Sequence, residues 1–355
     1  MAKQCDDFEY IGKTLSSLGY VCVDFESKSE IPLSLSREIN KGETNTYRKV
    51  ANHYGVKYTD VLPLSFNIVK NPYDGNSQSE MIISEDDIRE VTRWLTSSAL
   101  PQWLTVTTKN NSVRYKGLFT DITTFVVGCD VLGLEILFTC DSPYAYTGDI
   151  ITSKDVAGYD TLTIENNSDE LEDYVYPTIS IDSVVTGSVF IHNLTDSMEF
   201  ESGTLSNEEN SYLTSLTNKV TEYAKMHGYE VEFRESNTNI VPIINNTCLQ
   251  FDYIDKFGTV TQCVAYFDDK YNYSIFSGGF MYMNVLSNNP IIINCEKYQI
   301  YDYIQREILL SDIGLEDVGE MYWMRYLSGE NNIRVFANNA TITFRHKEER
   351  KIGAI

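Results

Sequence analysis

The sequence predicts a mainly β protein with two β-sandwich domains, and three observations lead to this fold class. Apolar residues alternate with polar ones in short segments along most of the 355 residues, as in strands that are buried on one face. Helical spacing of apolar residues occurs in only two segments. The chain is also longer than one hydrophobic core usually supports, since common domains have roughly 100 to 200 residues.

The boundary between the two domains is predicted near residue 150. The alternating segment Leu134–Cys140 runs into a turn that contains Pro143. Proline cannot donate to a sheet ladder, and it pushes the preceding residue into extended backbone, so Pro143 closes the strand. We therefore assign residues 1–150 to the first domain and residues 151–355 to the second, with a polar joint over residues 148–158.

The first domain is expected to be a sandwich with one amphipathic helix. The helix begins at Ser84, where Asp87 completes a capping box, and it ends before Pro101. Its apolar stripe contains Trp94 and packs over the open side of the strands. The predicted strands are Phe8–Gly12, Tyr20–Phe25, Leu62–Val69, Leu104–Val106, Val113–Tyr115, Phe119–Val127 and Leu134–Cys140.

The second domain repeats the β pattern and contains an inserted α+β subdomain at about residues 201–285. The insertion begins with a helix that has a capping box at Ser206 and Glu209 and ends at Gly228. Four strands follow it: Tyr229–Phe233, Cys248–Ile254, Val260–Phe267 and Tyr273–Phe276. The strands of the sandwich itself are Leu162–Ile164, Pro177–Ile181, Gly187–Ile191, Pro290–Glu296, Met321–Leu327 and Asn332–Val335.

Charge limits the classes of partner. The net charge is −23; residues 1–150 hold 14 basic and 20 acidic residues (−6), and the remainder holds 14 and 31 (−17). Such an acidic chain is repelled by nucleic acid and by anionic membranes. We therefore expect neither sequence-specific nucleic-acid binding nor membrane insertion, and we expect proteins, cations or neutral glycans as partners. The seven cysteines contain no C-x-x-C pair, which favours buried free thiols.

No motif for catalysis or for a cofactor is found. The sequence lacks G-x-x-x-x-G-K-[ST], G-x-S-x-G and H-E-x-x-H, so we expect no enzyme, no cofactor and no metal site. Asp252, Asp255, Asp268 and Asp269 could form a cation site or a glycosidase pair, but turn carboxylates in an acidic domain are the favoured interpretation. Without a signal peptide or an apolar run of 18 residues, synthesis in a cytoplasm is expected.

Four tyrosines of the insertion suggest a glycan platform, because a tyrosine ring can stack on a sugar while its hydroxyl stays in water. They are Tyr253, Tyr266, Tyr271 and Tyr273. Tyrosine is frequent in this chain, with 25 residues. Core packing therefore remains the alternative for each of them.

Several short motifs, in order, resemble the distal tail protein (Dit) family of long-tailed phages. The resemblance rests on the helix Ser84–Thr96, the end of the first domain at residues 142–145, and four segments of the second domain. Those segments are Asn166-Asn167-Ser168, Tyr176–Ile181, Ile291–Glu296 and Leu327–Ile333. Asn294 and Ser328 depart from the family's usual aspartate and proline, and the insertion replaces a short connection.

The resemblance implies a structural role in the virion. It implies an N-terminal ring-forming domain, a galectin-like C-terminal domain and a homohexameric ring at the tail tip or baseplate. The ring would join the tail tube protein to tail-associated tip proteins and receptor-binding proteins, in virions made in a bacterial cytoplasm. Trp94, Trp103 and Tyr115 are candidate subunit contacts, with burial inside one subunit as the alternative. The rival functions are a glycan-binding host-adhesion module and a glycoside hydrolase.

Overall fold

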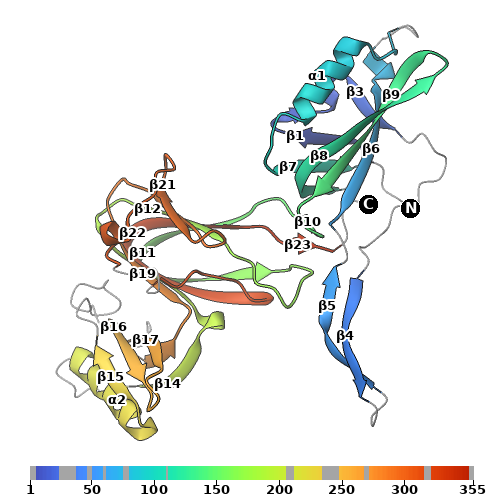
Figure 1. Ribbon diagram of the computed structural model, residues 1–355. Coiled ribbons are helices and arrows are strands. Elements are labelled where there is room, and N and C mark those ends of the chain that lie inside the picture. The colour runs from blue at the N-terminus through green and yellow to red at the C-terminus, as the bar shows by residue number, and fades with distance from the viewer. Residues whose placement is uncertain are drawn as a thin grey trace. The chain divides into compact units, whose positions relative to one another are not determined.

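The computed structural model describes residues 5–23, 37–45, 50–58, 61–74, 80–108, 111–204, 212–233, 248–267, 272–315 and 321–351. The chain divides into two compact units (Figure 1). Unit 1 comprises Met1–Gly148 with Glu348–Ile355, and unit 2 comprises Asp149–Lys347. Strands make up most of the structure and helices little of it, which confirms the predicted mainly β class.

Unit 1 is built on one antiparallel sheet of nine strands. The order along the sheet is β2-β1-β7-β8-β9-β6-β3, and β10 pairs with β8 and β23. The strands are β1 Asp7–Tyr10, β2 Lys13–Thr14, β3 Tyr20–Val23, β6 Pro63–Lys70, β7 Gln102–Thr108, β8 Asn111–Val127, β9 Asp130–Cys140, β10 Ala145–Tyr146 and β23 Glu349–Arg350.

The helix α1 (Glu85–Leu95) covers the apolar side of this sheet. The predicted capping box is confirmed: Ser84 Oγ accepts from the Asp87 N–H at 3.2 Å, and the Asp87 carboxylate accepts from the Ser84 N–H at 2.8 Å. Val91, Trp94 and Leu95 are buried in a core that is rich in aromatic rings. The predicted segments Val113–Tyr115 and Phe119–Val127 belong to one long strand, β8.

Unit 1 also contains one strand from the C-terminal end of the chain and one separate hairpin. The last strand, β23, pairs with β10, Ala145 opposite Arg350, so residues from both ends of the chain complete the unit. Strands β4 (Arg37–Asn45) and β5 (Val50–Tyr58) form a separate two-stranded sheet. The Tyr58 ring contacts the Tyr144 ring edge to face, with 5.4 Å between centroids.

Unit 2 contains a seven-stranded antiparallel sheet in the order β19-β13-β22-β12-β20-β21, with β11 along β22. Residues 333–337 of β22 pair with β13, and residues 340–345 pair with β12. Both halves contribute to one core, so the sheet folds over on itself. The strands are β11 Ile150–Asn166, β12 Thr178–Ser183, β13 Gly187–Asn193, β19 Phe280–Val285, β20 Ile291–Asn294, β21 Gln299–Asp302 and β22 Gly329–His346.

Two sequence expectations for unit 2 are wrong. Residues 150–158 form no joint: they begin β11, which continues to Asn166 with a bulge between Val156 and Gly158. The segment Met321–Leu327 forms no strand apart from an isolated bridge between Tyr326 and Val175. It is apolar because Met321, Met324 and Tyr326 enter the core, so apolar content alone was misleading there.

The second sheet of unit 2 has five strands in the order β14-β18-β17-β16-β15. The helix α2 (Tyr212–His227) packs on one face through Leu216, Val220 and Ala224. The other face shares a core with the seven-stranded sheet. The strands are β14 Met198–Thr204, β15 Glu230–Phe233, β16 Cys248–Ile254, β17 Val260–Phe267 and β18 Asn272–Ser277. The predicted box at Ser206 and Glu209 lies outside the described residues.

The described residues also contain the short 3-10 helices η1 Ser16–Leu18, η2 Pro72–Asp74, η3 Leu194–Asp196 and η6 Leu310–Ile313. Among the residues described, neither α1 nor α2 is long and apolar enough to span a membrane.

Candidate interaction surfaces

Two of the three predicted subunit contacts are buried inside unit 1. Trp94 is 6% exposed, stacks on Phe8 with 5.8 Å between ring centroids, and donates its indole N–H to the Tyr10 carbonyl oxygen at 2.9 Å. Tyr115 is 2% exposed. Both side chains therefore stabilise the unit itself. Trp103 is 36% exposed and packs edge to face on Tyr146, so it alone of the three presents a ring at the surface.

The last three residues of β8, directly before the turn into β9, expose apolar side chains, and we call them the apolar tip. They are Phe125, Val126 and Val127, and the two valines are each 51% exposed. A register shift between Phe125 and Val126 interrupts the alternation of buried and exposed positions. Contiguous apolar surface of this kind marks sites of protein contact. The sequence signal for it was a run of apolar residues directly before Gly128, which breaks the period of two.

The β4–β5 hairpin is a second feature that suits assembly. Within the described residues its two strands pair only with each other. An isolated two-stranded hairpin is at best marginally stable in water, and its unpaired backbone groups invite another strand. The hairpin therefore gains stability from any partner that covers its edges.

The tyrosines expected to contact glycan are buried where the structure describes them. Tyr253 and Tyr273 lie in the core beneath α2, where the Tyr253 hydroxyl donates to the Val220 carbonyl oxygen at 3.0 Å and the Tyr273 hydroxyl donates to Glu201 at 2.6 Å. Tyr266 is fully buried between the two sheets of unit 2. These three rings cannot line an exposed groove in this fold, and Tyr271 lies outside the described residues.

Tyr266 belongs to a polar contact that fixes the five-stranded sheet to the seven-stranded one. His192 Nδ1 and the Tyr266 hydroxyl are 2.7 Å apart, and Arg334 Nη1 donates to the same hydroxyl at 3.2 Å. Burial, with a smaller contribution from the Arg334 charge, lowers the pKa of His192 to about 3. The imidazole is therefore neutral at physiological pH.

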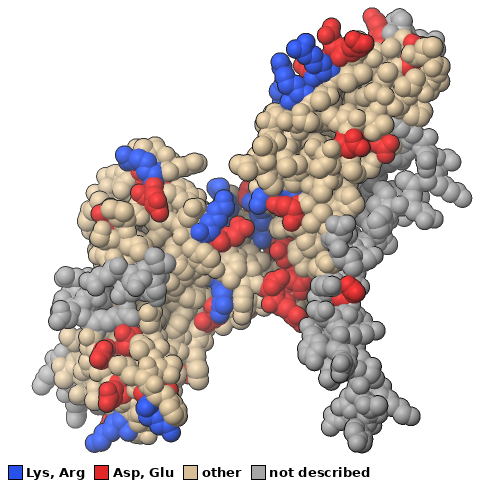
Figure 2. Space-filling model, viewed as in Figure 1, with Lys and Arg blue, Asp and Glu red and all other residues tan. Residues whose placement is uncertain are grey.

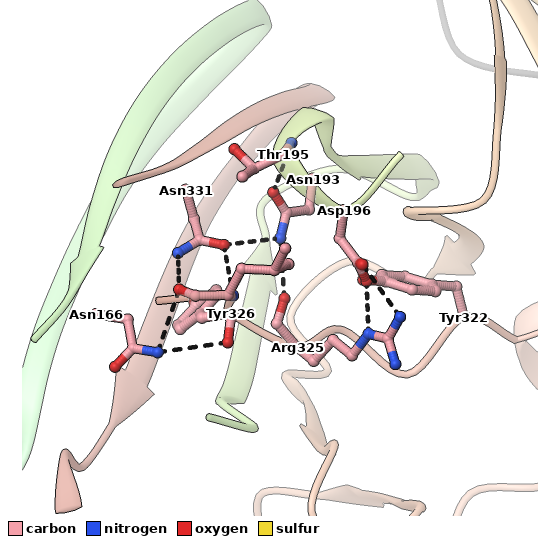
Figure 3. A network of polar contacts seen from close by, with 9 residues as sticks. Asn166, Asn193, Thr195, Asp196, Tyr322, Arg325, Tyr326 and Asn331 are labelled. Carbon is pink, nitrogen blue, oxygen red and sulfur yellow. Dashed lines mark hydrogen bonds and ion pairs between the residues drawn. The ribbon is translucent and has the colours of Figure 1, made fainter. Parts of the chain in front are cut away.

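Three buried asparagines hold the irregular segment 325–329 (Figure 3). Asn193 donates to the Arg325 carbonyl oxygen at 2.9 Å, and Asn166 donates to the Leu327 carbonyl oxygen at 3.2 Å. Asn331 accepts from the Leu327 N–H at 2.9 Å and donates to its carbonyl oxygen at 2.8 Å. The asparagines thus satisfy partly buried backbone groups that no sheet ladder pairs.

A charged cluster continues this network from the segment to η3. Arg325 donates to both carboxylate oxygens of Asp196, at 2.7 and 3.1 Å, and the Tyr322 hydroxyl also donates to Asp196. The hydrogen bond to Asp196 raises the pKa of Arg325, and burial raises the pKa of Tyr322. The Arg325 guanidinium stacks on Tyr174, 4.0 Å from the ring centroid. Every group in this cluster has a structural partner.

Of the four carboxylates considered as a cation site or glycosidase pair, Asp255 lies in a turn. Asp255 Oδ1 accepts from the N–H groups of Phe257 and Thr259, each at 2.8 Å, and these bonds lower the pKa of Asp255. Asp252 is in β16, and Asp268 and Asp269 lie outside the described residues. In the described part of the chain no three histidine, cysteine or carboxylate side chains are grouped to hold a metal ion.

Charge does not define a single binding face on the side that Figure 2 shows. Acidic and basic side chains mix over α1, at one end of unit 1, and much of the neighbouring surface of that unit carries neither sign. This distribution suits contact with another protein surface better than attraction of one charged polymer.

Comparison with known proteins points to phage tails. Residues 3–142 match the family model described as a phage tail protein N-terminal domain, which confirms the expected resemblance over most of unit 1. A sequence comparison with curated proteins finds no match.

Three solved phage structures are similar at low identity. The crystal structure of the phage SPP1 Dit protein, described as a paradigm of the hub adsorption apparatus in phages infecting Gram-positive bacteria, is 12% identical with a TM-score of 0.49, covering 96% of this chain and 98% of that one. The phage P2 baseplate in its activated conformation with Ca is 10% identical (TM-score 0.46; 99% and 100% covered), and the form with Sr is 9% identical (0.44; 98% and 99%).

Proposed function

We propose that the chain is a structural subunit of a phage tail tip, which assembles through unit 1 into a hexameric ring that joins the tail tube to tip and receptor-binding proteins. The observation that carries this proposal is the match of residues 3–142 to a phage tail protein N-terminal domain. The role is non-enzymatic: the subunit positions its neighbours, and the virion tail tip is its place of action.

Two surfaces of unit 1 support assembly through that unit. The apolar tip offers three adjacent apolar side chains to a neighbouring subunit, and their burial is favourable at roughly 25 cal/mol per Å². The β4–β5 hairpin offers unpaired strand edges. In a closed ring each subunit joins one patch to a different patch of its neighbour, so tip and hairpin need not meet their own copies.

Unit 2 supports the role of a rigid module carried on the ring. Its irregular segment is tied by the three asparagines, and its two sheets are joined through Tyr266, His192 and Arg334. Three of the four tyrosines considered for the glycan-adhesion alternative, Tyr253, Tyr266 and Tyr273, are buried, which weighs against that alternative. We therefore favour the scaffold over the adhesion module.

The test compares two double variants by sedimentation velocity. V126S/V127S removes apolar surface from the tip of unit 1, and V184S/V185S makes the same change at an exposed turn of unit 2, where Val184 and Val185 are 61% and 40% exposed. We expect the first variant to shift the hexamer toward monomer by at least tenfold in dissociation constant, and the second to sediment as wild type.

The outcomes separate the contact from the function. A hexamer in both variants would mean that the apolar tip is not part of the ring contact. The β4–β5 hairpin would then be the remaining candidate, and its deletion would be the next variant to test. Loss of assembly in V184S/V185S alone would move the contact to unit 2 and contradict assembly through unit 1. Far-ultraviolet circular dichroism of each variant checks that the fold is retained.

A further inference from the structure

Two cysteine thiols of unit 1 lie in contact. Cys5 Sγ and Cys22 Sγ are 3.5 Å apart, with the Cys22 thiol donating to Cys5, and the Cys5 thiol donates to the Asp7 carbonyl oxygen at 3.3 Å. Both residues are free thiols and partly buried, at the edge of the core of unit 1. Oxidant can therefore reach them, unlike the buried Cys140 and Cys295.

The two cysteines lie at opposite ends of the strand order of the sheet in unit 1. Cys22 belongs to β3, the last strand in the order of the nine-stranded sheet. Cys5 lies two residues before the start of β1, which with β2 forms the other end. No ladder joins β1 or β2 to β3 within the described residues. The thiol contact thus lies where the two ends of the curled sheet meet.

We propose that Cys5 and Cys22 form a disulfide when the protein meets an oxidising environment, and that this bond closes the sheet of unit 1 covalently. Formation of the bond requires the sulfur atoms to approach from 3.5 Å to about 2.05 Å. This proposal does not depend on the hexameric ring, because it concerns one subunit.

The reaction is a thiol–disulfide exchange with a small disulfide such as oxidised glutathione. One cysteine thiolate attacks a sulfur of glutathione disulfide, a mixed disulfide forms, and one glutathione leaves as thiolate. The second cysteine thiolate attacks the protein sulfur of that mixed disulfide and releases the second glutathione. Two protein thiols lose two electrons and two protons, and one glutathione disulfide becomes two glutathione thiols.

Conditions for the reaction follow from the surroundings of Cys5. The hydrogen bond from Cys22, burial and the charges of Asp7 and Asp6 raise the pKa of Cys5. Since the thiolate is the reacting form, exchange is slow at neutral pH and faster in alkaline buffer. A reaction at pH 8.5 is therefore the suitable test.

The test uses the full chain with Cys129→Ser, because Cys129 is exposed and would link subunits. This variant retains six thiols of the seven. After incubation with oxidised glutathione and alkylation under denaturing conditions, we expect four free thiols, a peptide that joins Cys5 to Cys22, and a rise of several degrees in the melting temperature of unit 1 that dithiothreitol reverses.

Matched variants complete the test. C5S/C129S and C22S/C129S should show no such peptide and no rise in melting temperature, and each should carry glutathione on the remaining cysteine. The proposal is overturned if Cys5 and Cys22 of the Cys129→Ser protein both stay alkylatable, or both carry glutathione, while the circular dichroism spectrum is native.

Discussion

The indole N–H of Trp94 donates to the carbonyl oxygen of Tyr10 at 2.9 Å, which ties α1 to β1 across 84 positions of the sequence. The donor and acceptor are both buried, so the bond cannot be replaced by water without opening the core. Trp94 thus anchors the helix to the sheet it covers. This anchoring explains why a residue considered as a subunit contact lies inside the subunit.

Substitution of Trp94 should destabilise unit 1. Trp94→Phe keeps much of the ring but leaves the Tyr10 carbonyl oxygen without this donor, and we expect a loss of about 1 to 3 kcal/mol in the free energy of unfolding. Trp103→Phe is the control, because Trp103 is half exposed, and it should change stability by less than about 0.5 kcal/mol. Urea unfolding measures both; equal effects would contradict the anchoring role.

The capping box predicts that substitutions of Ser84 lower the stability of unit 1 by different amounts. Ser84→Ala removes the oxygen that accepts from the Asp87 N–H, and it should cost about 1 kcal/mol of unit 1 stability. Ser84→Asn restores an acceptor and should recover most of that loss. Thermal unfolding followed by circular dichroism distinguishes the variants, and an alanine variant as stable as the asparagine variant would show that the cap contributes nothing.

Asn331 and Asn332 form a matched pair in unit 2. Asn331→Ala leaves the partly buried N–H of Leu327 without its acceptor, and the Leu327 carbonyl oxygen keeps only the bond from Asn166, so we expect a loss of about 1 to 3 kcal/mol. Asn332→Ala removes one exposed contact with Thr163 and should cost less than about 1 kcal/mol. Guanidinium unfolding should give this order, and the reverse order would refute the role of Asn331 in holding segment 325–329.

His192 makes the stability of unit 2 depend on pH. Its pKa in the folded protein is about 3, below the ordinary value of 6.5, so the unfolded chain takes up a proton first as the pH falls. The resulting stability is full above pH 6.5 and is lost between pH 6.5 and 3, with an upper limit of about 5 kcal/mol.

The measurement compares wild type with His192→Gln and His227→Gln across that pH range. His192→Gln should flatten the acid dependence relative to wild type, while His227→Gln, at the exposed end of α2, should follow the wild-type curve. Parallel curves for all three proteins would mean that His192 is not the group that takes up the proton.

Sequence signals within a few consecutive residues predicted the helices and strands that such signals determine. The Ser84–Asp87 box located α1 within one residue, period-two alternation located β6, and the predicted segments Cys248–Ile254 and Val260–Phe267 coincide with β16 and β17. The family match confirmed the resemblance over residues 3–142, which the order of short motifs had indicated.

Non-local relations could not be predicted in this way. Nothing local in residues 349–350 indicates that they pair with β10, some 200 residues earlier. The sequence around Tyr253, Tyr266 and Tyr273 is compatible with buried rings and with an exposed platform. Only the packing of α2 and of the second sheet shows that the rings are buried. The apolar tip did have a local signal, because three apolar residues precede Gly128. These residues were predicted only as the end of a strand, since they continue the apolar segment of β8.

Static light scattering of the wild-type chain tests the ring most directly, because mass in solution depends on assembly and not on the placement of any one contact. Six copies of the 40.5 kDa chain give 243 kDa, and that mass is predicted over the micromolar range. A mass of 40.5 kDa at every concentration would contradict the formation of a ring by this chain alone.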